Sequence, residues 1–151
     1  MIPLRVGSKC WTMTNAMPLF SGTRLRALRP SPDGRWVAVT RTMEPDPAAN
    51  GLFVVATDGH GEPRPVTPFG GYRWRDGGRL LVIPQELDAA AMRLVEVDAA
   101  SGRSEVLAAP PGQQFRVAAG EWSVAPDGHA LAFRSADDDA VWVMGLGGRG
   151  E

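Results

Sequence analysis

The sequence predicts an all-β fold, a β-propeller segment of about three four-stranded antiparallel blades that follow an N-terminal partial blade. A tight turn that leads into an apolar strand occurs three times, and the aligned turn glycines Gly34, Gly78 and Gly128 are 44 and 50 residues apart. Periods of about 40 to 50 residues with several short strands in each unit are typical of propeller blades. The apolar runs are short and are bounded by Gly, Pro and Asp, a pattern that favours strands and turns over helices.

The segment 1–22 is predicted to be the end of an earlier blade or, as the alternative, an N-terminal extension. The strands of a blade are lettered a to d from the central channel outward. One large apolar position recurs at spacings of 42, 41 and 48 residues, close to the blade period, and is occupied by Trp11, Phe53, Leu94 and Trp142. We therefore expect residues 10–14 to form a strand c and residues 17–20 to form a strand d. If the chain begins inside a blade, we expect it to be either a piece of a longer propeller or a ring in which its N-terminal strands complete the last blade.

Three blades are expected in residues 23–67, 68–109 and 110–151, the last without its outer strand. In chain order, their predicted strands are residues 25–30, 36–41, 52–57, 65–67, 72–75, 79–83, 92–98, 104–108, 122–125, 130–134 and 141–144. The Asp-Gly pairs fall in the turns between these strands, where glycine adopts positive φ and the carboxylate accepts hydrogen bonds from backbone N–H groups. We therefore assign structural roles to Asp33 and Asp127.

Composition argues against several classes of partner. The net charge of −1 gives no electrostatic reason to expect nucleic acid, although residues 1–41 carry six more basic than acidic side chains. No apolar run approaches the ~18 to 20 residues of a membrane span, and the single Cys10 excludes an internal disulfide. The N-terminus lacks the pattern of a signal peptide. We expect a cytoplasmic location if Met1 is the true start, with an extracytoplasmic one as the alternative for a longer parent chain.

The segment 31–67 carries Ser-Pro-Asp-Gly, an apolar strand, a variable loop, a second apolar strand, an Asp-Gly turn and a short outer strand that ends in Val-Thr. This order resembles the TolB-like propeller repeat, and it is similar to repeats in the N-terminal propellers of dipeptidyl-peptidase and prolyl-oligopeptidase family proteins. The second copy departs from the pattern, because Arg75-Asp76-Gly77-Gly78 replaces the Pro-Asp-Gly turn. The resemblance implies a noncatalytic scaffold that binds a protein or peptide. The alternative that it implies is a fragment of a substrate-gating propeller of a serine peptidase, with the hydrolase domain outside this chain.

The sequence predicts no catalytic residue, no cofactor site and no metal site. A nucleophile elbow of the Gly-x-Ser-x-Gly type is absent from the sequence. Residues 145–150 match the dinucleotide fingerprint, but we assign them to a turn because no helix follows. Residues 137–139 are three consecutive aspartates without the alternate spacing of a calcium loop, and His60 and His129 fall in expected turns. We therefore expect the chain not to be an enzyme.

Binding residues are expected on the face formed by the b to c and d to a loops, which are longer and more varied than the turns at the other end. The candidates that we assign to binding are two inner-strand tryptophans and four charged residues near that face: Trp74, Trp122, Arg41, Arg73, Glu121 and Arg134. The expected partner is a protein or a peptide. A homodimer that completes a ring of about six blades is a further expectation, in which each copy lends the strand 17–20 to the other.

Overall fold

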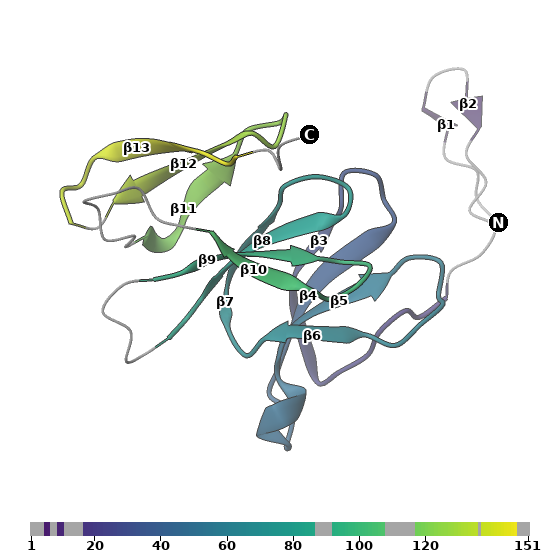
Figure 1. The fold of residues 1–151 in the computed structure, drawn as a ribbon. Coiled ribbons are helices and arrows are strands. Elements are labelled where there is room, and N and C mark those ends of the chain that lie inside the picture. Colours follow the sequence, from purple (N-terminus) through teal and green to yellow (C-terminus); the bar gives the residue numbers. More distant parts are fainter. Residues whose placement is uncertain are drawn as a thin grey trace.

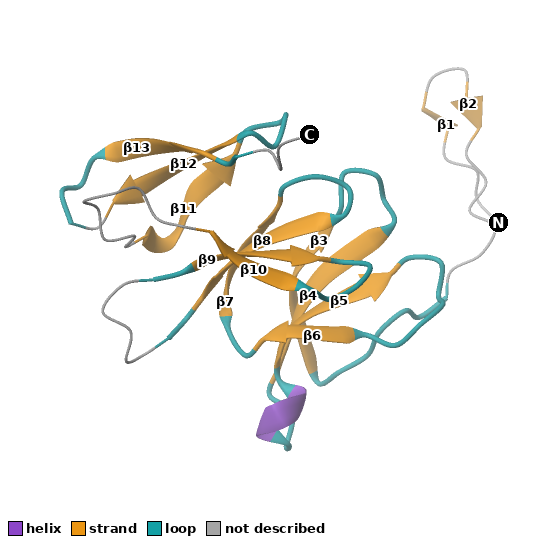
Figure 2. Ribbon diagram, in the orientation of Figure 1, coloured by secondary structure: helices purple, strands orange, loops and turns teal. Residues whose placement is uncertain are grey.

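The computed structural model describes residues 5–6, 9–10, 17–86, 92–107, 117–135 and 137–147 (Figure 1). Within these residues the fold is all-β, as predicted, and three antiparallel sheets of four, four and three strands lie one after another along the chain (Figure 2). We call these sheets blade 1, blade 2 and blade 3. No strand pairing described by the structure joins one blade to the next, so each blade is an open sheet.

Each blade is a meander in which consecutive strands are neighbours. A two-stranded hairpin of β1 (Arg5–Val6) and β2 (Lys9–Cys10) precedes them. Blade 1 comprises β3 (Arg24–Pro30), β4 (Trp36–Thr42), β5 (Gly51–Ala56) and β6 (Arg64–Thr67), with the short 3-10 helix η1 (Pro47–Ala49) before β5. Blade 2 comprises β7 (Gly70–Trp74), β8 (Arg79–Pro84), β9 (Leu94–Asp98) and β10 (Ser104–Leu107). Blade 3 comprises β11 (Val117–Val124), β12 (Ala130–Ser135) and β13 (Val141–Gly145).

The predicted blade strands are confirmed, with bounds that agree within two residues except at the start of β11. That strand begins at Val117 and not at Trp122, and its register with β12 shifts between these two residues. Short apolar runs between Gly and Asp turns favour these strands, and the central strands β5 and β8 have buried residues on both faces.

The predicted strand at residues 17–20 is wrong, whereas the predicted strand at residues 10–14 is described only at Cys10. Cys10 pairs with Arg5 in the hairpin of β1 and β2, and residues 11–16 lie outside the described residues. Residues 17–20 form no strand. The side chains of Leu19 and Phe20 pack instead on blade 1, where Phe20 lies 5.1 Å from the ring centroid of Phe53.

Alternation along the strands explains why Leu19 and Phe20 bind there. Ala38, Leu52 and Val54 face blade 2. Their neighbours in sequence face the opposite side of blade 1, because successive side chains of a strand alternate between its two faces. That side carries Val39, Phe53 and Val55, and an apolar sheet face must be covered. Leu19, Phe20 and Leu25 cover it in the described chain.

The core lies between the blades. One cluster joins blade 1 to blade 2 and contains Leu52, Val54, Tyr72, Leu80 and Val82. A second cluster joins blade 2 to blade 3 and contains Leu81, Ile83, Trp122, Leu131 and Phe133. Leu80 and Leu81 are neighbours in β8 and face opposite sides, so the central blade supplies both interfaces.

The two ends of the blades differ as predicted. The a to b and c to d turns meet at one end, where the Thr57 hydroxyl donates to the carbonyl of Gly34 at 2.7 Å and the Ala99 amide to that of Gly78 at 2.8 Å. The b to c and d to a loops meet at the other end, where the Gln85 amide donates to the carbonyl of Phe69 at 3.0 Å. We call the first the turn end and the second the loop end.

Candidate functional site

The inner strands of all three blades line one pocket of about 350 Å³, which we call the inner-strand pocket. Its walls are Leu28–Pro30 of β3, Arg73 and Trp74 of β7, and Ser123 and Val124 of β11. These residues lie where each inner strand approaches its following turn, so the pocket lies toward the turn end. The strand topology alone brings together three segments that are about 45 to 50 residues apart in sequence.

A bulge in β3 shapes one wall of the pocket. The register of β3 with β4 shifts between Arg26 and Arg29, and Ala27 within the bulge has a φ of 52°. The carbonyls of Ala27 and Arg29 accept hydrogen bonds from strand β7 of blade 2: the first from the Tyr72 hydroxyl, the second from the Trp74 indole N–H at 2.8 Å. The bulge thereby ties β3 to β7 and leaves Leu28 63% exposed at the pocket.

The charge of the pocket is positive. Arg29 and Arg73 are its charged lining residues, and no carboxylate is among the lining residues that the structure describes. The Arg73 guanidinium lies 5.1 Å from the ring centroid of Trp122, and its Nη1 donates to the Tyr72 carbonyl at 2.8 Å. Burial lowers the pKa of Arg73, and the positive charge of Arg29 lowers it further. The two guanidiniums therefore repel each other in partly desolvated surroundings.

The sequence matches no family model, and no curated protein matches it at a significant level. No helix in the described ranges is long and apolar enough to cross a membrane. The pocket can therefore be described only from the structure of this chain, and not from a related protein. Two of the six predicted binding residues, Arg73 and Trp74, line it.

The other four predicted residues lie elsewhere. Trp122 is 5% exposed and packs between blades 2 and 3 beneath the guanidinium of Arg73. Arg134 forms ion pairs with Glu121, at 2.5 Å, and with Asp139 on the exposed surface of blade 3. The structure gives these groups packing and pairing contacts, and a binding role for them stays a prediction.

Arg41 lies on the face of blade 1 that is turned away from blade 2 and covered by Leu19 and Phe20. Its guanidinium lies 4.8 Å from the ring centroid of Phe20 and 4.6 Å from that of Phe53, and its Nε donates to the Ala49 carbonyl at 2.6 Å. These contacts hold residues 17–22 and the loop around η1 against β4. Arg41 thus joins segments of its own chain, and it does not line the inner-strand pocket.

Sequence reasoning missed the other five lining residues of the pocket, which are Leu28, Arg29, Pro30, Ser123 and Val124. The excess of basic side chains in residues 1–41 is a signal for Arg29, but a charge summed over 41 residues does not identify which arginine lines a pocket. The bulge at Ala27 directs this part of β3, and no turn residue in the sequence marks that bulge. Ser123 joins the pocket because β11 lies beside β7.

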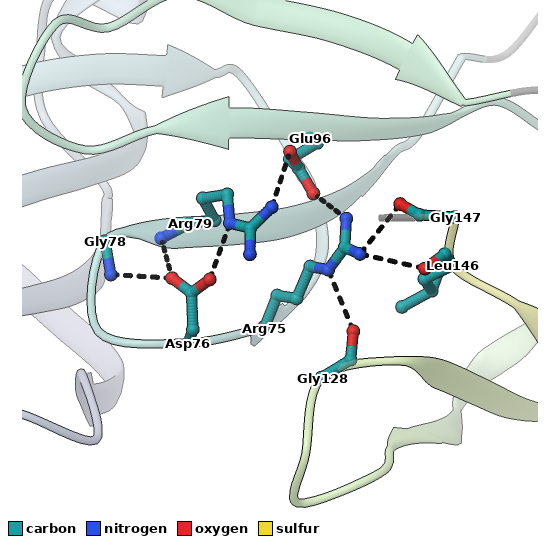
Figure 3. Close-up of polar contacts among 8 residues, drawn as sticks. All are labelled: Arg75, Asp76, Gly78, Arg79, Glu96, Gly128, Leu146 and Gly147. Carbon is teal, nitrogen blue, oxygen red and sulfur yellow. Dashed lines mark hydrogen bonds and ion pairs between the residues drawn. The ribbon is translucent and has the colours of Figure 1, made fainter. Parts of the chain in front are cut away.

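A buried polar network at the turn end holds blade 3 on blade 2 (Figure 3). Arg75 forms an ion pair with Glu96, and the two side chains are 3% and 9% exposed. The same guanidinium donates to the carbonyls of Gly128 and Leu146 at 2.9 Å and of Gly147 at 3.1 Å. The guanidinium of Arg75 thus joins the Glu96 carboxylate of blade 2 to three backbone carbonyls of blade 3, so the network positions these two blades.

The turn carboxylates have the structural role that the sequence predicted. Asp33 accepts from the Arg35 amide at 3.1 Å and from the Ser31 hydroxyl at 2.6 Å, and these hydrogen bonds lower its pKa to about 2. Asp127 accepts from the His129 amide at 2.9 Å. Among the aspartates at 137–139, Asp138 accepts from the Ala140 amide at 3.0 Å. Within the described ranges, no group of three or more metal-ligating side chains occurs.

Proposed function

We propose that this chain is a noncatalytic TolB-like propeller segment that acts as a protein or peptide interaction scaffold, with the inner-strand pocket as its contact surface. The observation that carries the proposal is the pocket itself, in which apolar and cationic side chains from three blades meet. Sites that bind ligands are concave, mostly apolar and fixed in shape, with a few polar groups that orient the ligand. Leu28 and Trp74 supply the apolar walls here, and Arg29 and Arg73 supply the charge.

Rigidity and exposure both support this assignment. All seven residues of β3 are at least partly exposed, although β3 is an inner strand with a fixed position. Tyr72 and Trp74 of β7 hold its carbonyls, so a partner would meet a preformed surface. Preformed surfaces lose less conformational entropy on binding.

The test is a selection of random twelve-residue peptides by phage display against the immobilised chain. Leu28→Glu places a charge in the pocket, and Val106→Glu is the matched control because it also changes an exposed strand residue, in β10. We expect enriched peptides to bind wild type and Val106→Glu equally and to lose binding to Leu28→Glu. The proposal is refuted if no sequence is enriched, or if the enriched peptides bind both variants equally.

The proposal extends to self-association through the outer edge of β13. In the described residues no strand pairs with this edge, and Val141 and Val143 are 76% and 71% exposed. The outer strands of the other blades carry Pro65 and Glu105, which discourage further pairing. The sequence Val-Trp-Val-Met-Gly of β13 has neither proline nor charge. A strand from a second copy is the partner that we propose for it, in a homodimer.

The sequence predicted that residues 17–20 of one copy would pair with blade 3 of the other. We do not assign this role to them, because Leu19 and Phe20 cover blade 1 of their own chain. Size-exclusion chromatography with light scattering tests the dimer directly. We expect wild type at twice the chain mass of 16.2 kDa and Val143→Lys at the monomer mass. A wild-type monomer, or a dimer that Val143→Lys leaves intact, would contradict self-association through β13.

A further inference from the structure

The inner strand of blade 1 carries a row of three arginines, and we infer that this row binds an extended acidic segment of a partner protein, with carboxylates at alternate residues. The row consists of Arg24, Arg26 and Arg29 in β3. The inference rests on the proposed function, because it names the class of peptide that the scaffold would bind. Arg29 also lines the inner-strand pocket, so the row extends that contact surface along β3.

The bulge in β3 places the three arginines on one face of blade 1. In register, they pair with alternate residues of β4, which are Thr42, Thr40 and Ala38. Alternate residues of a strand lie on one face of the sheet, and residues paired in register share that face. Without the bulge, Arg29 would lie on the face opposite to Arg26, because three positions separate them. The extra residue of the bulge returns Arg29 to the face of the row.

The bulge also gives the row a regular spacing. Neighbouring arginines lie opposite residues of β4 that are two positions apart, and two positions of a strand span about 7 Å. An extended peptide with an acidic side chain at every second residue repeats over the same distance and presents its carboxylates on one side. Such a peptide, laid along β3, would place one carboxylate near each arginine.

Carboxylates of the described chain do not balance the charges of the row. All three arginines are exposed, and none of them forms an ion pair in the ranges that the structure describes. Nη1 of Arg24 donates to the neutral Sδ of Met43 at 3.7 Å. The residues of β7 that precede Tyr72 are Gly70 and Gly71, which carry no side chain that could pair with Arg26. An anionic partner would therefore meet three unbalanced charges.

The backbone of the row is fixed before a partner binds. The Ala27 carbonyl accepts from the Tyr72 hydroxyl, and the Arg29 carbonyl accepts from the Trp74 indole N–H. β3 is therefore attached to blade 2 as well as to β4. A partner would order the arginine side chains but no loop, which limits the entropy lost on binding.

An acidic peptide suits the row better than a single-stranded nucleic acid, which is also an extended polyanion. Proteins that bind single strands combine basic side chains with aromatic rings on which the bases stack. In the described residues the exposed aromatic side chain is that of Phe69, which lies at the loop end and outside β3. The exposed apolar side chains near the row are aliphatic, since Leu28 is 63% and Met43 66% exposed. They offer no stacking surface to a base.

The test is the binding of fluorescein-labelled eight-residue peptides, measured by fluorescence anisotropy at low and at physiological ionic strength. The first probe consists of four Glu-Thr repeats, so its glutamates alternate. The matched control has the same composition, with four glutamates followed by four threonines. A peptide of Gln-Thr repeats tests the need for charge, and an oligothymidylate of eight nucleotides tests the nucleic-acid alternative.

Arg26→Glu reverses the central charge of the row, and Arg103→Glu is the matched control because Arg103 is an exposed arginine of blade 2 outside the row. We expect the alternating peptide to bind wild type and Arg103→Glu with equal affinity. It should bind Arg26→Glu about tenfold more weakly, because an attraction becomes a repulsion of similar size. Arg26→Gln only removes the charge and should weaken binding about threefold. The affinity of wild type should fall as the ionic strength rises.

Four results would overturn the inference. They are the absence of saturable binding of the alternating peptide, equal affinities of the alternating and the clustered peptide, tighter binding of the oligothymidylate, and equal losses of affinity in Arg26→Glu and Arg103→Glu. A peptide selection that depends on Leu28 would survive any of them. The scaffold proposal and the acidic-segment inference therefore fail separately.

Discussion

Replacing Glu96 by glutamine should loosen blade 3 from blade 2. Glu96 is 9% exposed and is the carboxylate partner of Arg75, whose side chain is 3% exposed. Arg79 also lies 3.8 Å from the second oxygen of Glu96. The amide of glutamine has nearly the same shape but no charge, so the variant leaves the guanidinium of Arg75 buried without a counterion.

The structure allows the size of this effect to be estimated. Removal of one partner from a buried ion pair typically destabilises a protein by about 3–5 kcal/mol, because the remaining charge stays desolvated. Total stabilities of single domains are about 5–15 kcal/mol, so this loss is a large share. Arg75→Met should cost at least as much, because the carbonyls of Gly128, Leu146 and Gly147 lose their donor as well. The double variant should cost less than the sum of the two, since no charge is left unpaired.

Urea unfolding followed by tryptophan fluorescence measures the total effect, and hydrogen exchange locates it. Because Arg75 contacts the turn before β12 and the residues after β13, amides of these strands should exchange faster in Glu96→Gln than those of β4 and β5. The exposed ion pair of Glu86 and Arg93 provides the control, and Glu86→Gln should change stability little. Equal effects of Glu96→Gln and Glu86→Gln would refute the role of the buried pair.

Two further predictions concern the turns. The pKa of Asp33 should be about 2 in a carboxyl NMR titration, and Ser31→Ala should raise it, since the Ser31 hydroxyl is the largest cause of the lowering. Because the folded-state pKa lies below the ordinary value of 3.8, this carboxylate stabilises the fold above pH 3.8 and loses that effect as the pH falls toward 2. Gly34 and Gly128 have φ values of 72° and 73°, but a Cβ would meet open space at Gly34 and would lie 2.7 Å from the Arg75 carbonyl oxygen at Gly128. Alanine should therefore cost about 1–2 kcal/mol at Gly34 and clearly more at Gly128, as measured by urea unfolding; equal costs would contradict a close approach of blades 2 and 3.

The strands of the blades could be predicted because local rules determine them. Short apolar runs between Asp-Gly turns permit little besides antiparallel hairpins, and the third repeat ends in a strand at Val141–Gly145 as the pattern required. Residues 17–20 were not predictable in the same way. Their apolar side chains suit a strand, but the uncovered face of Phe53 and its neighbours recruits them as a cover. Tertiary burial decides between these two structures, and the local sequence is compatible with both.

The candidate site could be predicted only in part. Trp74 was identified because it lies on an inner strand, which the repeat alignment places correctly, and Arg73 because a charged residue was expected near the loop end. The positions of Leu28 and Arg29 in the pocket depend on a bulge that no residue type in the sequence predicts. The position of Ser123 depends on how β11 lies beside β7. The pocket lies toward the turn end, whereas the sequence predicted binding residues at the loop end, because loop length reveals where a chain varies and not where side chains of three blades meet.

Contacts between blades share a feature that explains why the fold is visible in a sequence without a matching family model. Side chains of one blade donate hydrogen bonds to backbone carbonyls of an adjacent blade: Trp74 to Arg29, Arg64 to Ala99 at 3.3 Å, and Arg75 to Gly128. A backbone carbonyl is present whatever the side chain, so the accepting blade is free to vary in sequence. The donor needs only to be long and to carry an N–H group. The fold therefore depends on turn chemistry and short apolar strands, and these blade contacts do not require a particular side chain at the accepting residue.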